Sequence, residues 1–307
     1  MGPNDDSTAQ DEATVGEPTA SAGTLEVRPL SSHEELLAVE QLQRDVWGLD
    51  EVEIVPGSQI RAVIHAGGQL AGAFVDGRLV GFSYGFLAQP HGRGMRGPGL
   101  HSHMVAVNAA ARGHGVGRAL KWDQRAWCLA RGLGWITWTF DPLQARNANL
   151  NLEHLGAVGA EYLPDFYGPM SGPLGGGQAT DRLLALWPLA SDVVEGLRAG
   201  GVRPAAPRPP AAVWALRRAG EGALAGPQLV PVDDEAVSRG AAILVAVPTD
   251  VTHLLGAAPD LARAWRAAVG RAMIPLFDRG YAASRMVEGA YVLQPFGEDV
   301  KAAVGEW

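Results

Sequence analysis

The sequence has a single cysteine, Cys128, among its 307 residues. One thiol cannot form a disulfide within the chain, and proteins without disulfides are typical of reducing compartments. Apolar runs are also short, and none approaches the roughly 20 residues that a membrane-spanning helix needs. These shortages exclude a disulfide-stapled scaffold and a helical membrane protein, and they predict a cytoplasmic protein with no membrane partner.

Basic residues are outnumbered, with 25 Lys and Arg against 33 Asp and Glu, so the formal net charge is −8. Proteins that bind nucleic acid present basic surfaces to the phosphate backbone, so we expect no nucleic-acid partner. Apolar residues make up 47% of the chain, which suffices for a globular core.

Composition changes along the chain predict its domain organisation. Residues 1–23 are small and acidic and have few apolar side chains, which indicates a disordered tail rather than a signal peptide. Residues 191–212 end in a Pro/Gly-rich stretch typical of a linker. We therefore expect a first folded domain at 24–190 and a C-terminal α/β extension of unknown role at 213–307.

Hydrophobic periodicity and turn signals predict the order of elements in both regions. The first region is expected to contain strands and helices in the order β-α-α-β-β-β-α-β-α-β-β, at 25–30, 33–47, 57–66, 69–75, 78–87, 99–107, 116–131, 135–140, 147–155, 157–167 and 181–188. The second is expected to contain strands at 213–217 and 242–247, a helix at 260–278 and a strand pair within 281–293. A strand that leads through a helix into the next strand predicts a parallel pairing inside a mixed sheet.

The C-terminal region repeats one pattern of the first. The strand that ends at Val107, the helix with Trp122 and the strand at Trp135 have counterparts in a strand at 244–247, a helix with Trp265 and a strand at Tyr281. The second copy lacks a Gly-rich turn. It is either a degenerate duplicate or an unrelated βαβ-like unit.

The strongest motif is the Gly-rich turn Arg112-Gly113-His114-Gly115-Val116-Gly117-Arg118. It follows an expected strand and opens an expected helix. The first N–H groups of a helix have no partner within it and carry the positive end of its dipole, and glycines let that backbone approach an anion closely. The turn therefore predicts a pyrophosphate site. Its glycine spacing matches neither the dinucleotide fingerprint nor a P-loop.

The stretch Arg112–Gly117 resembles the R-x-x-G-x-G coenzyme A signature of the GNAT (Gcn5-related) N-acetyltransferase superfamily. The order of elements over residues 25–190 is similar to that family as well. ITWTFDPLQARNANLNLEHLGA, DFYG and DRLLALW, at 136–157, 165–168 and 181–187, resemble a subgroup of predicted GNAT proteins with poorly defined acceptors. The resemblance implies the acyl-CoA N-acyltransferase fold: an α/β chain of the α+β type, with a mixed, mostly antiparallel sheet flanked by helices. If the repeated pattern described above is a true duplicate, the C-terminal extension is a degenerate second GNAT-like half.

The resemblance implies a role for each matching residue. The turn would hold the pyrophosphate of acetyl-CoA through backbone N–H groups and Arg118. Main-chain groups of Val105 and Val107 would pair with the pantetheine arm, and Asn147 would bond that arm too. The turn residues carried over as cofactor-binding are Arg112, Gly113, His114, Gly115, Val116, Gly117 and Arg118.

In this family an amine attacks the thioester directly, with help from a base and from N–H groups that stabilise the oxyanion. His101 and His103 precede the turn on one strand and share a face, because side chains alternate. We expect His101 to be the base or a water relay, with His103 second. Two other interpretations are open: imidazoles that only bond neighbouring loops, or an H-x-H metal pair, which lacks a third ligand by spacing, so no metal is predicted.

Many relatives place a tyrosine near the end of the helix after the next strand, where it protonates the leaving thiolate. Leu152 stands at that position. Tyr167 could replace the tyrosine from a neighbouring strand, or the thiol could leave unassisted. The substitution equally leaves open a binding protein without chemistry.

Other candidates have simpler structural interpretations. Cys128 is expected to be a packed thiol. Arg93 and Arg96 precede the active strand and would be solvated or would meet an anion. The helix with Arg263, Arg266 and Arg271 is expected to present these arginines to solvent.

The sequence thus predicts an acyltransferase that moves an acetyl group from acetyl-CoA to the amine of a small molecule. The alternatives are an acyl-CoA sensor without turnover and a protein or peptide N-acetyltransferase. A monomer or a homodimer is expected.

Overall fold

The computed structural model describes residues 24–48, 53–168, 178–201, 203–204 and 208–296. The strands are β1 Leu25–Pro29, β2 Gln69–Val75, β3 Arg78–Ala88, β4 Gly99–Val107, β5 Trp135–Phe140, β6 Val158–Leu163, β7 Arg182–Pro188, β8 Val213–Ala219, β9 Gly226–Leu229, β10 Ile243–Ala246, β11 Tyr281–Val287 and β12 Ala290–Pro295. The helices are α1 His33–Trp47, α2 Gly57–His65, α3 Val116–Leu129, α4 Ala145–Asn149, α5 Asp192–Arg198, α6 Asp234–Ser238, α7 Val251–Ala257 and α8 Pro259–Asp278, with a 3₁₀ turn η1 Ala109–Ala111 and a π-helical turn η2 Leu150–His154. The expected tail at 1–23 lies outside the described residues.

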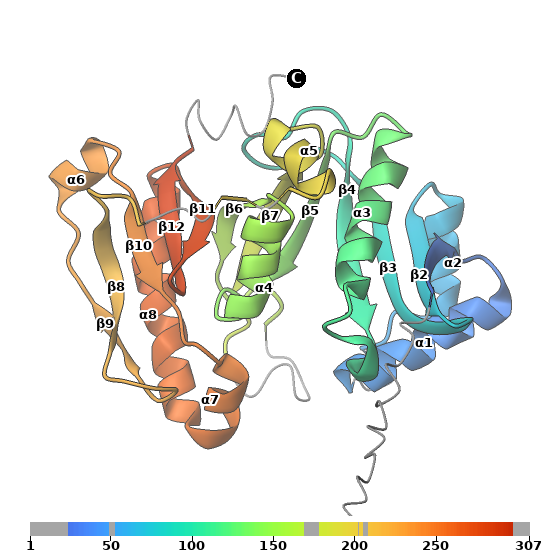
Figure 1. Cartoon of the computed structure of the whole chain (residues 1–307), viewed down its shortest axis with the longest axis horizontal. Coiled ribbons are helices and arrows are strands. Elements are labelled where there is room, and N and C mark those ends of the chain that lie inside the picture. Colours follow the sequence, from blue (N-terminus) through green and yellow to red (C-terminus); the bar gives the residue numbers. More distant parts are fainter. Residues whose placement is uncertain (1–23, 49–52, 169–177, 202, 205–207, 297–307) are drawn as a thin grey trace, which may run out of the picture.

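The twelve strands of the described residues belong to one sheet, which runs from the α1–α2 side to the β8–β9 hairpin (Figure 1). Its order is β1-β2-β3-β4-β5-β7-β6-β11-β12-β10-β8-β9. Neighbouring strands are antiparallel except for β4 with β5 and β10 with β8. The predicted mixed, mostly antiparallel sheet of the α+β type is confirmed.

Two local features of the first region follow from its sequence. Ser32 caps α1, and Glu35 closes a capping box with it. Asp76 and Gly77, with φ of 50° and 75°, form the tight turn between β2 and β3. Strong local signals thus fix the start of α1 and the hairpin that precedes β4.

Helices cover both faces of the β2–β4 region. Val105 and Val107 pack with Val116 and Leu120 of α3 on one face. Phe82, Tyr84 and Ala106 pack against α1 and α2 on the other, with the side chains Leu36, Val39, Leu42 and Ile60. The central sheet therefore lies between α3 and the α1–α2 pair.

One core continues from the first region into the C-terminal region. Leu100 of β4, Trp187 of β7, Trp265 of α8 and Leu293 of β12 all belong to it. The joint between the two parts of the sheet is narrow, because β6 and β11 pair at Gly159↔Ala283 alone among the described residues. Side-chain packing, more than strand pairing, therefore joins the regions.

The two βαβ-like units differ in strand pairing. In the first, β4 and β5 are parallel neighbours. In the second, β12 lies between β10 and β11 and is antiparallel to both. The units share an order of elements but not the pairing of their outer strands.

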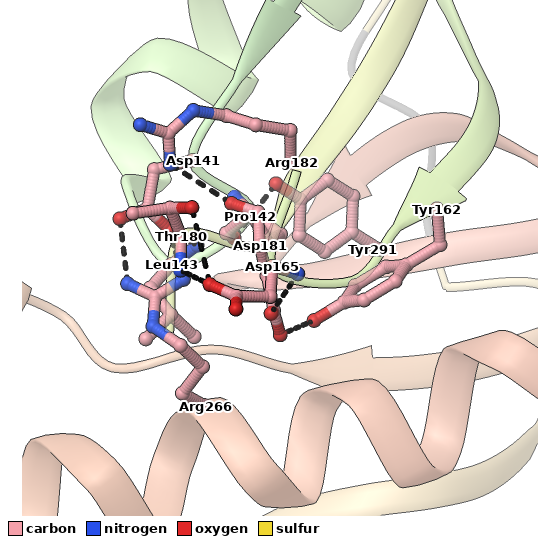
Figure 2. A network of polar contacts seen from close by, with 10 residues as sticks. All are labelled: Asp141, Pro142, Leu143, Tyr162, Asp165, Thr180, Asp181, Arg182, Arg266 and Tyr291. Atoms are coloured by element: carbon pink, nitrogen blue, oxygen red, sulfur yellow. Dashed lines mark hydrogen bonds and ion pairs between the residues drawn. The ribbon is translucent and has the colours of Figure 1, made fainter. Parts of the chain in front are cut away.

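A buried polar network connects β5 to α8 (Figure 2). The Arg266 guanidinium donates to both carboxylate oxygens of Asp141, at 3.1 and 2.7 Å, and its side chain is only 8% exposed. Tyr291 of β12 donates to the carbonyl of Pro142 at 2.9 Å. The expectation that Arg266 faces solvent is therefore wrong, because the helix turns this arginine toward a carboxylate 125 residues away in the sequence.

The segment expected as a linker, 191–212, begins with a helix. Residues 192–198 form α5, whose first turn is capped by the Ser191 hydroxyl. Arg125 of α3 forms a salt bridge with Glu195 and donates to the carbonyl of Leu189 at 2.7 Å. The described start of 191–212 is thus packed on α3.

Candidate active site

The Gly-rich turn has the open geometry that an anion site needs. Gly113 and Gly115 have φ of 83° and 79°, a conformation that side-chain-bearing residues rarely adopt. Gly115 is the N-cap of α3, and no side chain caps the helix there. A Cβ added at Gly113 or Gly115 would meet nothing within 4 Å, and one at Gly117 would meet only Val107 Cγ2 at 3.7 Å. The first N–H groups of α3 therefore border free space.

The charged residues of the turn are exposed and bonded to the backbone. The guanidinium of Arg112 donates to the carbonyl of Val107 at 3.1 Å, and that of Arg118 donates to the carbonyl of Leu197 at 3.2 Å. The ring of His114 lies 3.0 Å from the carbonyl of Arg112. Arg118 thus contacts α5, a contact that the sequence did not predict.

The two parallel strands beside the turn separate after a short contact. Their register contains Leu100↔Ile136 and His101↔Thr137 and ends there. The half of β4 with Val105 and Val107 is paired with β3 but not with β5 within the described register. The edge of β4 that faces β5 therefore has no strand partner directly before the turn, and the Val107 carbonyl on β4 accepts from Arg112 instead.

The histidines lie together on the face opposite α3. Tyr84 pairs with Met104 and Gly85 with Ser102, so β4 bulges at His103. The rings of His101 and His103 are 6.4 Å apart, and Phe86 contacts both. His101 Nδ1 lies 3.1 Å from Thr137 Oγ1 on β5. The prediction that the two imidazoles share a face is confirmed.

His101 is held neutral near pH 7. Its burial, then the positive charges that His103, His91 and Lys121 can carry, lowers its pKa from 6.5 to about 4. The ring is therefore unprotonated and able to accept a proton near pH 7, but a pKa this low makes it a weak base in the free protein.

The depressed pKa of His101 predicts a pH-dependent stability. Between about pH 6.5 and pH 4 the unfolded chain binds a proton at this residue that the folded chain does not, so stability falls as pH decreases through this window, by at most about 3 kcal/mol. Urea unfolding at pH 7 and pH 4 measures the loss. His101→Gln, which can still bond Thr137, should lose correspondingly less. Parallel losses in both proteins would contradict the depressed pKa.

Tyr167 contacts β5, the strand that also carries Thr137. Its hydroxyl and Thr139 Oγ1 are 3.0 Å apart, and the Arg182 guanidinium lies 5.1 Å from its ring centre. Thr137 and Thr139 alternate onto the same face of β5. Thr137 contacts His101 and Thr139 contacts Tyr167, so β5 links the two sides of the candidate site.

Two further residues of the sequence prediction lie near the end of β5. Asn147 is exposed on α4, and Leu152 is fully buried in the core. Leu152 therefore has a packing role, and its position offers no proton donor. Cys128 is buried, as predicted, and burial raises the pKa of its thiol to about 12.

Sequence reasoning missed Lys121. This residue of α3 is 5% exposed, and its Nζ donates to Ser102 Oγ at 2.8 Å and to Gln124 Oε1 at 3.2 Å. Nζ also lies 3.8 Å from the ring centre of Trp138 on β5. The signal was present in the sequence, since Lys121 and Lys301 are the only lysines of the chain.

The described residues contain no group of three or more His, Cys, Asp or Glu side chains placed to hold a metal ion. No helix in the described ranges is both long and apolar enough to cross a bilayer.

Several solved structures are similar to part of this chain. Solved structures similar to this chain include the ribosomal-protein-S18-alanine N-acetyltransferase of Escherichia coli, at 14% identity and TM-score 0.43, with 54% of this chain and 94% of that chain covered. Another is yncA, a putative acetyltransferase of Salmonella typhimurium with its cofactor acetyl-CoA, at 16% identity and TM-score 0.43, with the same shares covered. A third is NAA60 of Arabidopsis thaliana with a bisubstrate analogue, at 17% identity and TM-score 0.43, with 53% and 98% covered.

No curated protein matches the sequence. The model of the acetyltransferase (GNAT) family matches residues 36–156. The match begins within α1, includes the Gly-rich turn and ends two residues after η2. This part of the chain, residues 36–156, is therefore similar to the GNAT acetyltransferase family.

Proposed function

We propose that this protein transfers an acetyl group from acetyl-CoA to the amine of a small molecule. The observation that carries the proposal is the uncapped N-terminus of α3 beside the unpaired edge of β4. The first can bind the pyrophosphate of coenzyme A, and the second can pair with its amide-bearing arm.

The turn fits a pyrophosphate in shape and in charge. Helix N-termini bind phosphates through free N–H groups and the positive end of the dipole. Gly113, Gly115 and Gly117 leave open space where side chains would stand in the way. Arg112 and Arg118 add positive charge at the rim, although each now bonds a backbone carbonyl.

The unpaired edge of β4 fits the pantetheine arm. From Val107 back to Ser102 the strand spans about 16 Å. Main-chain groups of Val105 and Val107 would exchange hydrogen bonds with the amides of the arm, as a neighbouring strand does. The thioester would then lie where β4 and β5 meet, next to His101 and Thr137.

The residues on the face of the sheet opposite α3 would take up and move the protons. Acetyl-CoA supplies the activated acetyl group as a thioester. His101, neutral near pH 7, would take the proton of the attacking amine, directly or through a water, while Thr137 orients its ring. His103 borders the same space and would orient the acceptor.

The domain boundaries are part of the proposal. Residues 24–190 would form the transferase unit, and 213–307 would be an extension that supports it. The support comes from Arg266, Tyr291 and Arg285, which contact Asp141, Pro142 and Glu153 in the segment after β5.

Titration of acetyl-CoA by calorimetry tests the site. We expect Gly117→Trp to fill the space before α3 and to weaken binding at least about 100-fold, because about two charge-assisted hydrogen bonds to phosphate are lost. Gly256→Trp is the control, since Gly256 is also a helical glycine and is exposed, with free space around it. No binding to the wild type, or equal binding to all three proteins, would overturn the proposal.

A sensor that binds acetyl-CoA without turnover is the second candidate, and the core position of Leu152 favours it. Release of free thiol with a panel of small amines and of peptides separates the outcomes. Turnover of small amines that His101→Ala abolishes, with acetyl-CoA affinity kept, supports the proposal. Turnover of peptides alone gives a peptide acetyltransferase, and tight binding with no turnover of either gives the sensor.

A further inference from the structure

The structure lacks a proton donor at the place where relatives are expected to carry one, because Leu152 is buried in the core. Coenzyme A leaves more readily as a neutral thiol than as a thiolate, so an acid beside the sulfur would speed its departure. Such an acid would have to lie beside the angle between β4 and β5, where the thioester would be held.

Lys121 occupies the α3 side of that angle. The last paired residues of the two strands are His101 and Thr137. The next residues along the strands are Ser102 and Trp138, and Lys121 Nζ contacts both, at 2.8 Å from Oγ and 3.8 Å from the ring centre. The amine thus bridges the strands at the point where they begin to separate.

All the partners of Lys121 in the described part of the chain are neutral. They are the hydroxyl of Ser102, the amide of Gln124 and the indole of Trp138. Gln124 is in turn bonded to Gln69, and Gln69 to Ser83, which completes a buried network without a carboxylate. A buried ammonium in such a setting loses part of its preference for the charged form.

The titratable groups that act on Lys121 are Cys128 on the same helix and His101 on β4. The Cys128 thiol is neutral near pH 7, because its pKa is raised to about 12. The side chains that face Lys121 from β2 and β5, Gln69 and Trp138, do not titrate. Burial is accordingly the main cause that lowers the pKa of Lys121 from 10.5 to about 7.

We propose that Lys121 is the general acid that protonates the leaving sulfur of coenzyme A. This inference rests on the proposed function. As the carbon–sulfur bond breaks, its electron pair passes to sulfur, and an Nζ–H proton of the Lys121 ammonium moves to that sulfur. The thiol then leaves. The neutral amine of Lys121 regains a proton, either from solvent or by taking up the proton that the acceptor has released.

The presence of lysine rather than arginine at position 121 supports the role of an acid that gives up its proton. The sequence has 25 Lys and Arg, and every one except Lys121 and Lys301 is arginine. An arginine at this position could supply charge but could not release a proton at neutral pH. A lysine at this position, in a chain whose other cationic residues are almost all arginine, fits a role that depends on titration.

The scarcity of lysine also gives a direct test. Protein labelled with ¹³C at the lysine ε-carbons should give two lysine signals, which Lys121→Met assigns by removing one. If that variant does not fold, Lys301→Arg assigns them by removing the other. The pH titration of the Lys121 signal is then measured in the free protein, with coenzyme A, and with desulfo-coenzyme A, which lacks the thiol.

We expect Lys121 to stay protonated to a higher pH with coenzyme A than with desulfo-coenzyme A, by about 1–3 pH units, because a thiolate within a few ångströms stabilises the ammonium. Equal titrations in the two complexes would overturn the assignment of Lys121 while leaving the coenzyme site intact. Failure of both ligands to bind would overturn the proposed function, and this inference with it.

Discussion

Replacement of Arg266 by methionine is expected to lower the free energy of unfolding by about 3–5 kcal/mol, the usual result of removing one partner of a buried ion pair. The variant leaves the Asp141 carboxylate, 23% exposed, without the guanidinium that now donates to both of its oxygens. The N–H of Leu143 would remain as a donor, at 2.9 Å. Urea unfolding at pH 7 measures the change.

Arg263→Met is the matched control on the same helix. Arg263 pairs with Asp260, whose side chain is 92% exposed, so its loss should cost less than about 1 kcal/mol. The double variant Asp141→Leu, Arg266→Met should recover part of the loss, because neither member of this pair is left without the other. A change for Arg266→Met as small as that of the control would contradict the structural role of the pair.

Lys121→Met is expected to have the opposite effect, raising the free energy of unfolding at pH 7 by about 1–4 kcal/mol. Both variants remove a buried cation, but Lys121 has no carboxylate to leave behind. Its folded pKa, about 7, lies below its unfolded value of 10.5. The unfolded chain therefore binds the extra proton between these values, and the wild type gains stability as pH rises through this window.

The gain of Lys121→Met should consequently be largest at pH 7 and should shrink toward pH 10. Arg125→Met provides the comparison on α3, since this buried arginine is paired with Glu195 and bonded to Leu189 and its loss should be destabilising. A Lys121→Met protein that is less stable than the wild type at both pH values would show that the ammonium contributes to the fold. A more stable variant with impaired transfer would show that the wild type retains this lysine at a cost to stability.

Features of the site that depend on neighbouring residues could be predicted from the sequence. The left-handed glycines at 113 and 115, the start of α3 and the shared face of His101 and His103 all follow from spacings of a few residues. The capping box at Ser32 and the Asp76-Gly77 turn follow for the same reason. In each case the local chain sets the conformation without reference to the rest of the fold.

Features that depend on distant partners could not be predicted. Arg266 looked like a solvated residue because its partner, Asp141, belongs to another region of the chain. The place of β12 between β10 and β11 depends on a strand pairing that no short pattern specifies. Lys121 sits on an amphipathic helix like any surface lysine, and only the meeting of β4 and β5 shows that its amine is enclosed.

The narrow joint at Gly159↔Ala283 has a consequence for anyone who would express part of this chain. A fragment that ends after β7 would expose the outer edge of β6, and a fragment that begins at β8 would expose β11, each with a row of free backbone groups. Both fragments would also uncover core side chains, Trp187 in one and Trp265 in the other. Such pieces are prone to self-association through their strand edges, whereas the two pieces produced together could assemble into the native sheet.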